Sequence, residues 1–238
     1  MKRFLTYLLL FCIGGICIVL WNPVHSKFYN LVLVGGVLGV WFSCVGLATL
    51  AKRKHLTTAL LFVPLVPLLL VLLMKPEPID PESLRPSYLN ELNDFTGSTY
   101  VWGGEAQGGI DCSGLPRRAL RNALFSYAFK EWNKNALTHA IEHWWFDASA
   151  RALSEGYRNY VQPLDVEGAV IEMDYSRLEP GDLAVDISGL HVLVYLGGDN
   201  WIQAAPEVGE VKVFKGRTGD NVWLRRPAKA YRWSILGD

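Results

Sequence analysis

The sequence lacks net charge, because its 23 lysine and arginine residues are balanced by 23 aspartate and glutamate residues. A neutral chain offers no electrostatic basis for binding nucleic acid or an acidic substrate, so we expect no nucleic-acid partner. Internal repeats and low-complexity tracts are also missing. Cysteine is scarce, and Cys112 is the only cysteine after residue 75, so it has no partner there for a disulfide.

The N-terminal third of the chain contains three stretches without charge. These are residues 4–21, 29–50 and 56–74, and the last of them contains two prolines. Each stretch is close to the roughly 20 residues that a helix needs to cross a bilayer. We therefore expect an all-α transmembrane anchor over residues 1–75, in contact with membrane lipid. Because proline removes a helical hydrogen-bond donor, the third stretch is expected to be a kinked span or a re-entrant hairpin.

The residues between these stretches predict how the chain crosses the membrane. The first stretch is followed by Trp21, Asn22 and Pro23 rather than by a small-residue cleavage site, so we expect it to be retained. Lysine and arginine lie before the first stretch and at residues 52–54, and basic loops stay in the cytoplasm. Three crossings then place everything after residue 75 in the periplasm or outside the cell. An unpaired thiol in such an oxidising compartment is open to oxidation, so we expect Cys112 to have a function.

The remaining residues read as a linker and one soluble domain. Proline-rich residues 76–86 are expected to be extended, and the domain to cover residues 87–238. Residues 115–160 are rich in alanine, leucine, arginine and glutamate, which predicts helix, and short runs of branched and aromatic residues follow. Helices followed by strands predict an α+β fold with an antiparallel sheet. The expected strands are residues 183–185, 191–196, 200–204, 211–214 and 222–225.

Cys112 lies where a glycine-rich stretch gives way to a predicted helix. Asp111 is a favourable N-cap residue, and Pro116 fits the first helical turn, where backbone N–H groups have no partner within the helix. The positive end of a helix favours a thiolate, which is the nucleophilic form of cysteine. Its backbone N–H groups can also stabilise an oxyanion. A buried, inert cysteine is the alternative interpretation of this segment.

His191 is the candidate base for this thiol. It opens an apolar run at residues 191–196 and follows a turn at residues 179–183. A nucleophilic thiol needs a nearby base and a third group that orients the imidazole. Taken alone, a histidine at the start of an apolar strand is more often an ordinary core residue.

Two blocks of the sequence together resemble the NlpC/P60 cysteine peptidases. The first covers residues 97–115 and contains the motifs YVWGG (100–104) and GIDCSGL (109–115). The second covers residues 180–197 and contains PGDL (180–183) and HVLVYLG (191–197). Both blocks occur in the order that the family has.

This resemblance implies a papain-like α+β fold, in which a helix carrying Cys112 packs on an antiparallel sheet carrying His191. It implies hydrolysis of amide bonds in bacterial cell-wall (peptidoglycan) peptides, with no metal or other cofactor. By the same match, Tyr100 lines the site near the thiol, and Asp111 and Ser113 lie on the substrate-binding side. The anchor then belongs in the bacterial inner (cell) membrane.

The sequence departs from the family at two places. The family's third polar residue, often histidine, falls at Gln203, whose amide can accept a hydrogen bond from imidazole without adding charge. An ordinary strand glutamine is the alternative. A long helical insertion, about residues 118–160, separates the two motif blocks and is expected to border the cleft.

Strand geometry sets a condition for Gln203 to reach His191. A regular four-residue turn at residues 197–200 would place Gln203 opposite Val194, on the face that His191 does not use. An odd-length or bulged hairpin would instead place Gln203 opposite Leu193, on the face shared with His191. We predict the irregular hairpin.

Three other functions stay open. The pattern HAIEH at residues 139–143 matches the H-x-x-E-H motif of inverted zinc peptidases, although no third ligand stands out. Related folds act as acyltransferases or lipid-directed thiol hydrolases. A non-catalytic module that binds wall peptides is the third possibility, against which the intact Cys112 and His191 argue.

Overall fold

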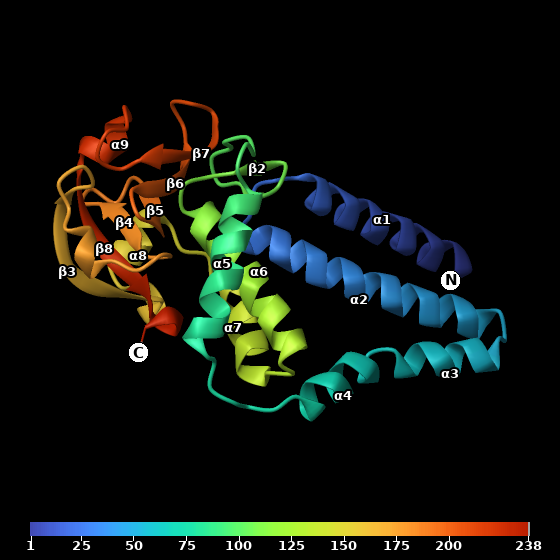
Figure 1. Cartoon of the computed structure of the whole chain (residues 1–238). Helices are drawn as coiled ribbons and strands as arrows, with labels where there is room; N and C mark the ends of the chain where they lie inside the picture. Colours follow the sequence, from blue (N-terminus) through green and yellow to red (C-terminus); the bar gives the residue numbers. More distant parts are fainter. Residues whose placement is uncertain (238) are drawn as a thin grey trace. The chain divides into compact units, whose positions relative to one another are not determined.

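The computed structural model describes residues 1–237 and divides the chain into two compact units, which meet between Lys75 and Pro76 (Figure 1). The first unit contains helices α1 (Lys2–Trp21), α2 (Lys27–Leu50), α3 (Lys54–Phe62) and α4 (Leu65–Leu73). Three stretches in it are long and apolar enough to cross a membrane.

Small residues allow α1 and α2 to pack closely. A Cβ atom added to Gly36 would lie 2.8 Å from a side-chain carbon of Ile16, so a larger residue there would push the helices apart. The third apolar stretch is interrupted between α3 and α4, where Pro64 precedes Leu65. This interruption agrees with the expected kink, because proline cannot donate the helical hydrogen bond.

Four helices open the second unit: α5 (Pro81–Asp94), α6 (Gly114–Lys130), α7 (Lys134–Trp145) and the short α8 (Ala150–Ser154). The last three account for most of the predicted helical insertion. The linker expected over residues 76–86 ends earlier, at Asp80. The Asp80 side chain accepts a hydrogen bond from the backbone N–H of Glu82, and Pro81 takes the first helical position, where its missing donor costs little.

A six-stranded antiparallel sheet forms most of the rest of the second unit, and α5, α6 and α7 gather beside it (Figure 1). A separate two-stranded antiparallel sheet, β1 (Glu105–Ala106) and β2 (Gly109–Ile110), lies between α5 and α6 in the chain. Its order is β3-β8-β4-β5-β6-β7, and every neighbouring pair is antiparallel. All four residues of β4 are buried, so the centre of the sheet is covered on both faces. The α+β prediction is confirmed. The strands are β3 (Val161–Ala169), β4 (Leu183–Asp186), β5 (Val192–Gly197), β6 (Asn200–Ala205), β7 (Glu210–Lys215) and β8 (Pro227–Trp233).

Residues 222–225 form the helix α9 (Val222–Arg225), so the strand predicted there is wrong. The cause lies one residue earlier: the side chain of Asn221 accepts a hydrogen bond from the backbone N–H of Trp223, and this cap starts a helical turn. No strand was predicted at β3 or β8, which pair with each other.

Candidate active site

The loop before α6 is fixed by the carboxylate of Asp111. It accepts hydrogen bonds from the backbone N–H groups of Gly103 (2.9 Å) and Gly114 (2.6 Å) and from the hydroxyl of Ser113 (3.0 Å). The helix begins at Gly114, so Asp111 satisfies its first N–H from outside. A Cβ atom on Gly114 would overlap the carbonyl oxygen of Gly104, which explains why glycine occurs there. With its carboxylate occupied, Asp111 holds the loop in shape.

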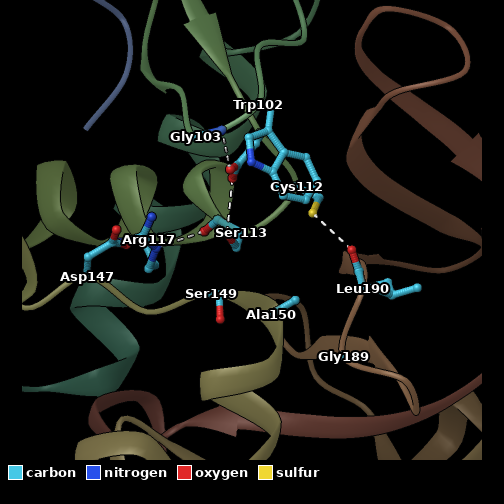
Figure 2. Close-up of a pocket in the computed structure, with 11 residues that line it drawn as sticks. Trp102, Gly103, Cys112, Ser113, Arg117, Asp147, Ser149, Ala150, Gly189 and Leu190 are labelled. Atoms are coloured by element: carbon cyan, nitrogen blue, oxygen red, sulfur yellow. Dashed lines mark hydrogen bonds and ion pairs between the residues drawn. The ribbon is translucent and has the colours of Figure 1, made fainter. Parts of the chain in front are cut away.

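Cys112 lies two residues before the start of α6, with its thiol turned toward Leu190, which precedes β5 (Figure 2). Its Sγ donates a hydrogen bond to the carbonyl oxygen of Leu190 at 3.8 Å, one residue before His191. Burial and the nearby Asp111 carboxylate raise the pKa of the Cys112 thiol to about 12, although the Val192 backbone N–H opposes them. The resting thiol is therefore protonated, because desolvation outweighs the helix end that was expected to favour thiolate.

His191 and Gln203 are in contact at the centre of the sheet. The Nε2 atom of His191 is hydrogen-bonded to Oε1 of Gln203, and both side chains are buried. The hairpin is irregular: Val194 pairs with Ile202, and the register shifts before the turn. This pairing places Leu193 opposite Gln203, so the predicted hairpin is confirmed. A hydrogen bond from Nε2 to the amide oxygen leaves Nδ1 as the proton-accepting nitrogen.

An indole covers one face of the His191 ring. The ring of Trp223 stacks on it with 4.2 Å between centroids and 13° between planes. Burial lowers the pKa of His191 to about 4, although the Gln203 hydrogen bond and the negative charges of Glu207 and Asp186 act in the other direction. The imidazole is thus neutral near pH 7 and able to accept a proton. Trp223 was not predicted to be a site residue, because residues 222–225 were expected to form a strand and instead form α9.

A pocket of about 230 Å³ opens beside the thiol (Figure 2). Cys112, Asp111 and Ser113 line it, and the helical insertion contributes residues 147, 149 and 150, so the insertion borders the cleft as expected. Tyr100, which was expected to line the site, is half-buried and is not among the residues that line this pocket; burial raises its pKa to about 12, and the Asp111 carboxylate acts in the same direction. The lining residues are Trp102, Gly103, Asp111, Cys112, Ser113, Arg117, Asp147, Ser149, Ala150, Gly189 and Leu190.

A buried ionic network supports the wall of this pocket. Glu105 lies 3.0 Å from Nη1 of Arg121 and 3.5 Å from Nη1 of Arg117. Arg117 also pairs with Asp147, which lies between α7 and α8, and thereby ties the α7–α8 connection to α6. The spacing of the two arginines, four residues apart on one helix face, was the only sequence signal for the network.

The H-x-x-E-H residues are explained by packing. His143 is buried, stacked on Tyr160 at 4.1 Å and edge-on to Trp233 at 5.6 Å between centroids. Burial lowers the pKa of His143 to about 3. His139 instead faces Glu142 at 3.6 Å on the helix surface. Across residues 1–237, no group of three His, Cys, Asp or Glu side chains is arranged to hold a metal ion.

Comparison with solved structures gives NlpC/P60 proteins. NlpC2 from Trichomonas vaginalis matches with 18% identity and a TM-score of 0.42, over 65% of this chain and 48% of that one. An NlpC/P60 family protein from Bacillus cereus matches with 17% identity and a TM-score of 0.41, over 66% of this chain and 41% of that one. The peptidoglycan hydrolase RipB from Mycobacterium tuberculosis matches with 18% identity and a TM-score of 0.39, over 63% and 65%.

This chain therefore spans less than half the length of the Trichomonas vaginalis and Bacillus cereus proteins. A comparison with curated proteins finds no match. The model of the NlpC/P60 family matches residues 97–230, more than half of the 238 residues, including Cys112, His191 and Gln203. The chain belongs to the NlpC/P60 family.

Proposed function

We propose that this protein is a membrane-anchored thiol hydrolase that cleaves amide bonds in cell-wall peptides. One arrangement carries the proposal: the thiol of Cys112 contacts the carbonyl of Leu190, and the next residue, His191, is oriented by Gln203. Membership of the NlpC/P60 family supports a wall-peptide substrate. The three apolar helical stretches support the anchor.

The proposed mechanism starts from a neutral pair. As Cys112 Sγ attacks the peptide carbonyl, Nδ1 of His191 takes the thiol proton, and the carbonyl oxygen becomes an oxyanion near the backbone N–H groups that open α6. Collapse breaks the C–N bond, His191 gives its proton to the leaving amine, and a thioester remains. Water, deprotonated by His191, then attacks the thioester, which releases the carboxylic acid and restores the thiol.

The direct test uses the full chain in detergent with soluble peptidoglycan fragments. Mass spectrometry should detect paired products whose masses sum to the substrate plus one water, which identifies hydrolysis of a single amide. Intact fragments after prolonged incubation with the full chain would contradict the proposed substrate class.

A lipid-directed thiol hydrolase or an acyltransferase is the second candidate, and the pocket rim favours it. Trp102 and Leu190 line the pocket yet are 78% and 53% exposed, and Ile187, three residues before Leu190, is 70% exposed. An apolar rim of this kind suits an acyl chain. Phospholipid vesicles added to the same assay separate the candidates: fatty acid or transferred acyl groups would replace the peptide products.

Gln203 is expected to orient His191 for proton transfer. Gln203→Leu removes the acceptor at Nε2 while keeping an apolar fill, so the imidazole loses its fixed orientation and kcat should fall roughly 10²-fold, within the range of general acid–base effects. Steady-state kinetics measure the change. Gln203→His, which places the family's usual residue type there, should retain more activity than Gln203→Leu; equal activity of Gln203→Leu and the wild type would refute the triad.

The second unit is expected to lie outside the inner membrane. The segment from Lys75 to Asp80 precedes α5 and is the exposed connection between the units, so a protease added outside the inner membrane should cut there and release a fragment of the second unit's size. Immunoblotting of spheroplasts measures this. Cleavage only after the membrane is permeabilised would reverse the predicted orientation.

A further inference from the structure

Trp223 is itself held by a carboxylate. Its indole Nε1 donates a hydrogen bond to Oε2 of Glu207 at 3.2 Å. The other oxygen of Glu207 accepts a hydrogen bond from the amide of Asn221, whose own oxygen caps α9 at the backbone N–H of Trp223. One acidic side chain in the turn after β6 therefore fixes both the helix that carries Trp223 and the indole ring.

His191 has a need that this arrangement meets. In the proposed mechanism its ring carries a positive charge, yet the side chain is 1% exposed and its hydrogen-bond partner Gln203 is neutral. A buried cation requires compensation. The face of an indole attracts a cation over its centre, and an acceptor at the indole N–H makes that face more negative.

Of the charged groups near His191, we assign the stabilising negative charge to Glu207. Asp186 precedes His191 on the neighbouring strand, but its carboxylate is paired with Arg226 at 2.9 Å. The guanidinium of Arg226 lies 5.1 Å from the Trp223 ring centre and opposes a positive charge on His191. The fourth group is the thiol of Cys112, which turns negative only as His191 turns positive. Glu207 is bonded to neutral indole and amide N–H groups, so its negative charge is not cancelled by these contacts.

We propose that Trp223 and Glu207 are positioning residues that stabilise the imidazolium form of His191, with Trp223 in contact with the ring and Glu207 acting through Trp223. The inference rests on the proposed Cys112–His191 chemistry. It supplies the negative charge that Gln203 lacks, and it assigns a role to the capped turn at residues 221–225.

The test is alkylation of Cys112 by iodoacetamide across a range of pH, on the full chain in detergent, with peptide mapping by mass spectrometry. Alkylation at neutral pH requires transfer of the thiol proton to His191, so its rate reports the stability of the imidazolium. Glu207→Gln removes the negative charge but keeps an acceptor for the indole N–H. Trp223→Phe removes the indole N–H but keeps an aromatic ring. Each should slow alkylation about 3- to 30-fold, the range of a cation–π contribution.

The pH dependence of alkylation separates this role from simple packing. Its acid limb is the low-pH range in which the alkylation rate rises with pH. Removing the negative charge makes the imidazolium less stable, so the pKa of His191 falls and the acid limb moves to lower pH. The double variant should be no slower than either single variant, because both break one link. Glu167→Gln is the control. It removes a carboxylate that pairs with Lys229 at the β3 edge of the sheet, away from β5, and should change neither the alkylation rate nor the acid limb.

An unmoved acid limb in both single variants, or a wild-type rate in Glu207→Gln, would overturn the inference. The assay needs no substrate, so it stands even if wall peptides are not cleaved. Its reference is His191→Ala: if that variant alkylates at the wild-type rate, the Cys112–His191 pair itself fails, and the proposed function fails with it.

Discussion

Cys112→Ala is expected to abolish turnover, with a fall in kcat of at least about 10⁴-fold. Losses of this size are typical when the nucleophile is removed from a set of catalytic residues that act together. The variant cannot form the thioester, and no hydroxyl replaces the thiol. The side chain is 6% exposed and donates one weak hydrogen bond, so its truncation leaves a small void and little structural change. The cleavage assay on wall-peptide fragments measures the loss.

The matched control is Cys44→Ala. Cys44 lies in α2, in the first unit, so its loss removes a thiol without touching the proposed site. This variant should turn over at the wild-type rate, and both variants should unfold at the wild-type temperature. Residual turnover above 1% of wild type in Cys112→Ala, an order-of-magnitude threshold, would mean that the thiol is not the nucleophile.

The parts of the site that follow local rules were predictable from sequence. Cys112 is placed by the loop-to-helix transition, which is encoded in adjacent residues. The meeting of His191 and Gln203 followed from strand alternation, because a pairing register shifted by one residue exchanges the faces of the sheet. The protonated state of the Cys112 thiol was not predictable, since it depends on burial by distant segments.

Other parts depended on contacts that no local pattern records. Residues 222–225 are rich in branched and aromatic side chains, and only the capping hydrogen bond at Asn221 turns them into a helix that places Trp223 on His191. The pairing of Glu105 with Arg117 and Arg121 joins a short strand, β1 (Glu105–Ala106), to α6. Charge patterns along a sequence do not reveal which charges become buried together.

Glu105→Ala is expected to destabilise the second unit strongly. The Glu105 side chain is buried between two guanidinium groups, those of Arg121 and Arg117, which are themselves buried. Removing the carboxylate leaves an excess of buried positive charge, which Asp147 at the pocket and the more weakly acting Asp111 offset in part. Breaking a buried ion pair by deleting one partner costs about 3–5 kcal/mol, so the free energy of unfolding should fall by this amount.

Urea unfolding of the full chain in detergent, followed by tryptophan fluorescence, measures the effect of Glu105→Ala. Glu167→Ala is the control, because it deletes a carboxylate from the exposed pair with Lys229, and such pairs contribute only about 0–1 kcal/mol. Glu105→Leu combined with Arg121→Met should recover part of the loss, because an apolar replacement of the pair leaves fewer buried charges without partners. A loss in Glu105→Ala no larger than in the control would show that water or other groups already compensate the two arginines, and the network would not be what fixes the α7–α8 connection to α6.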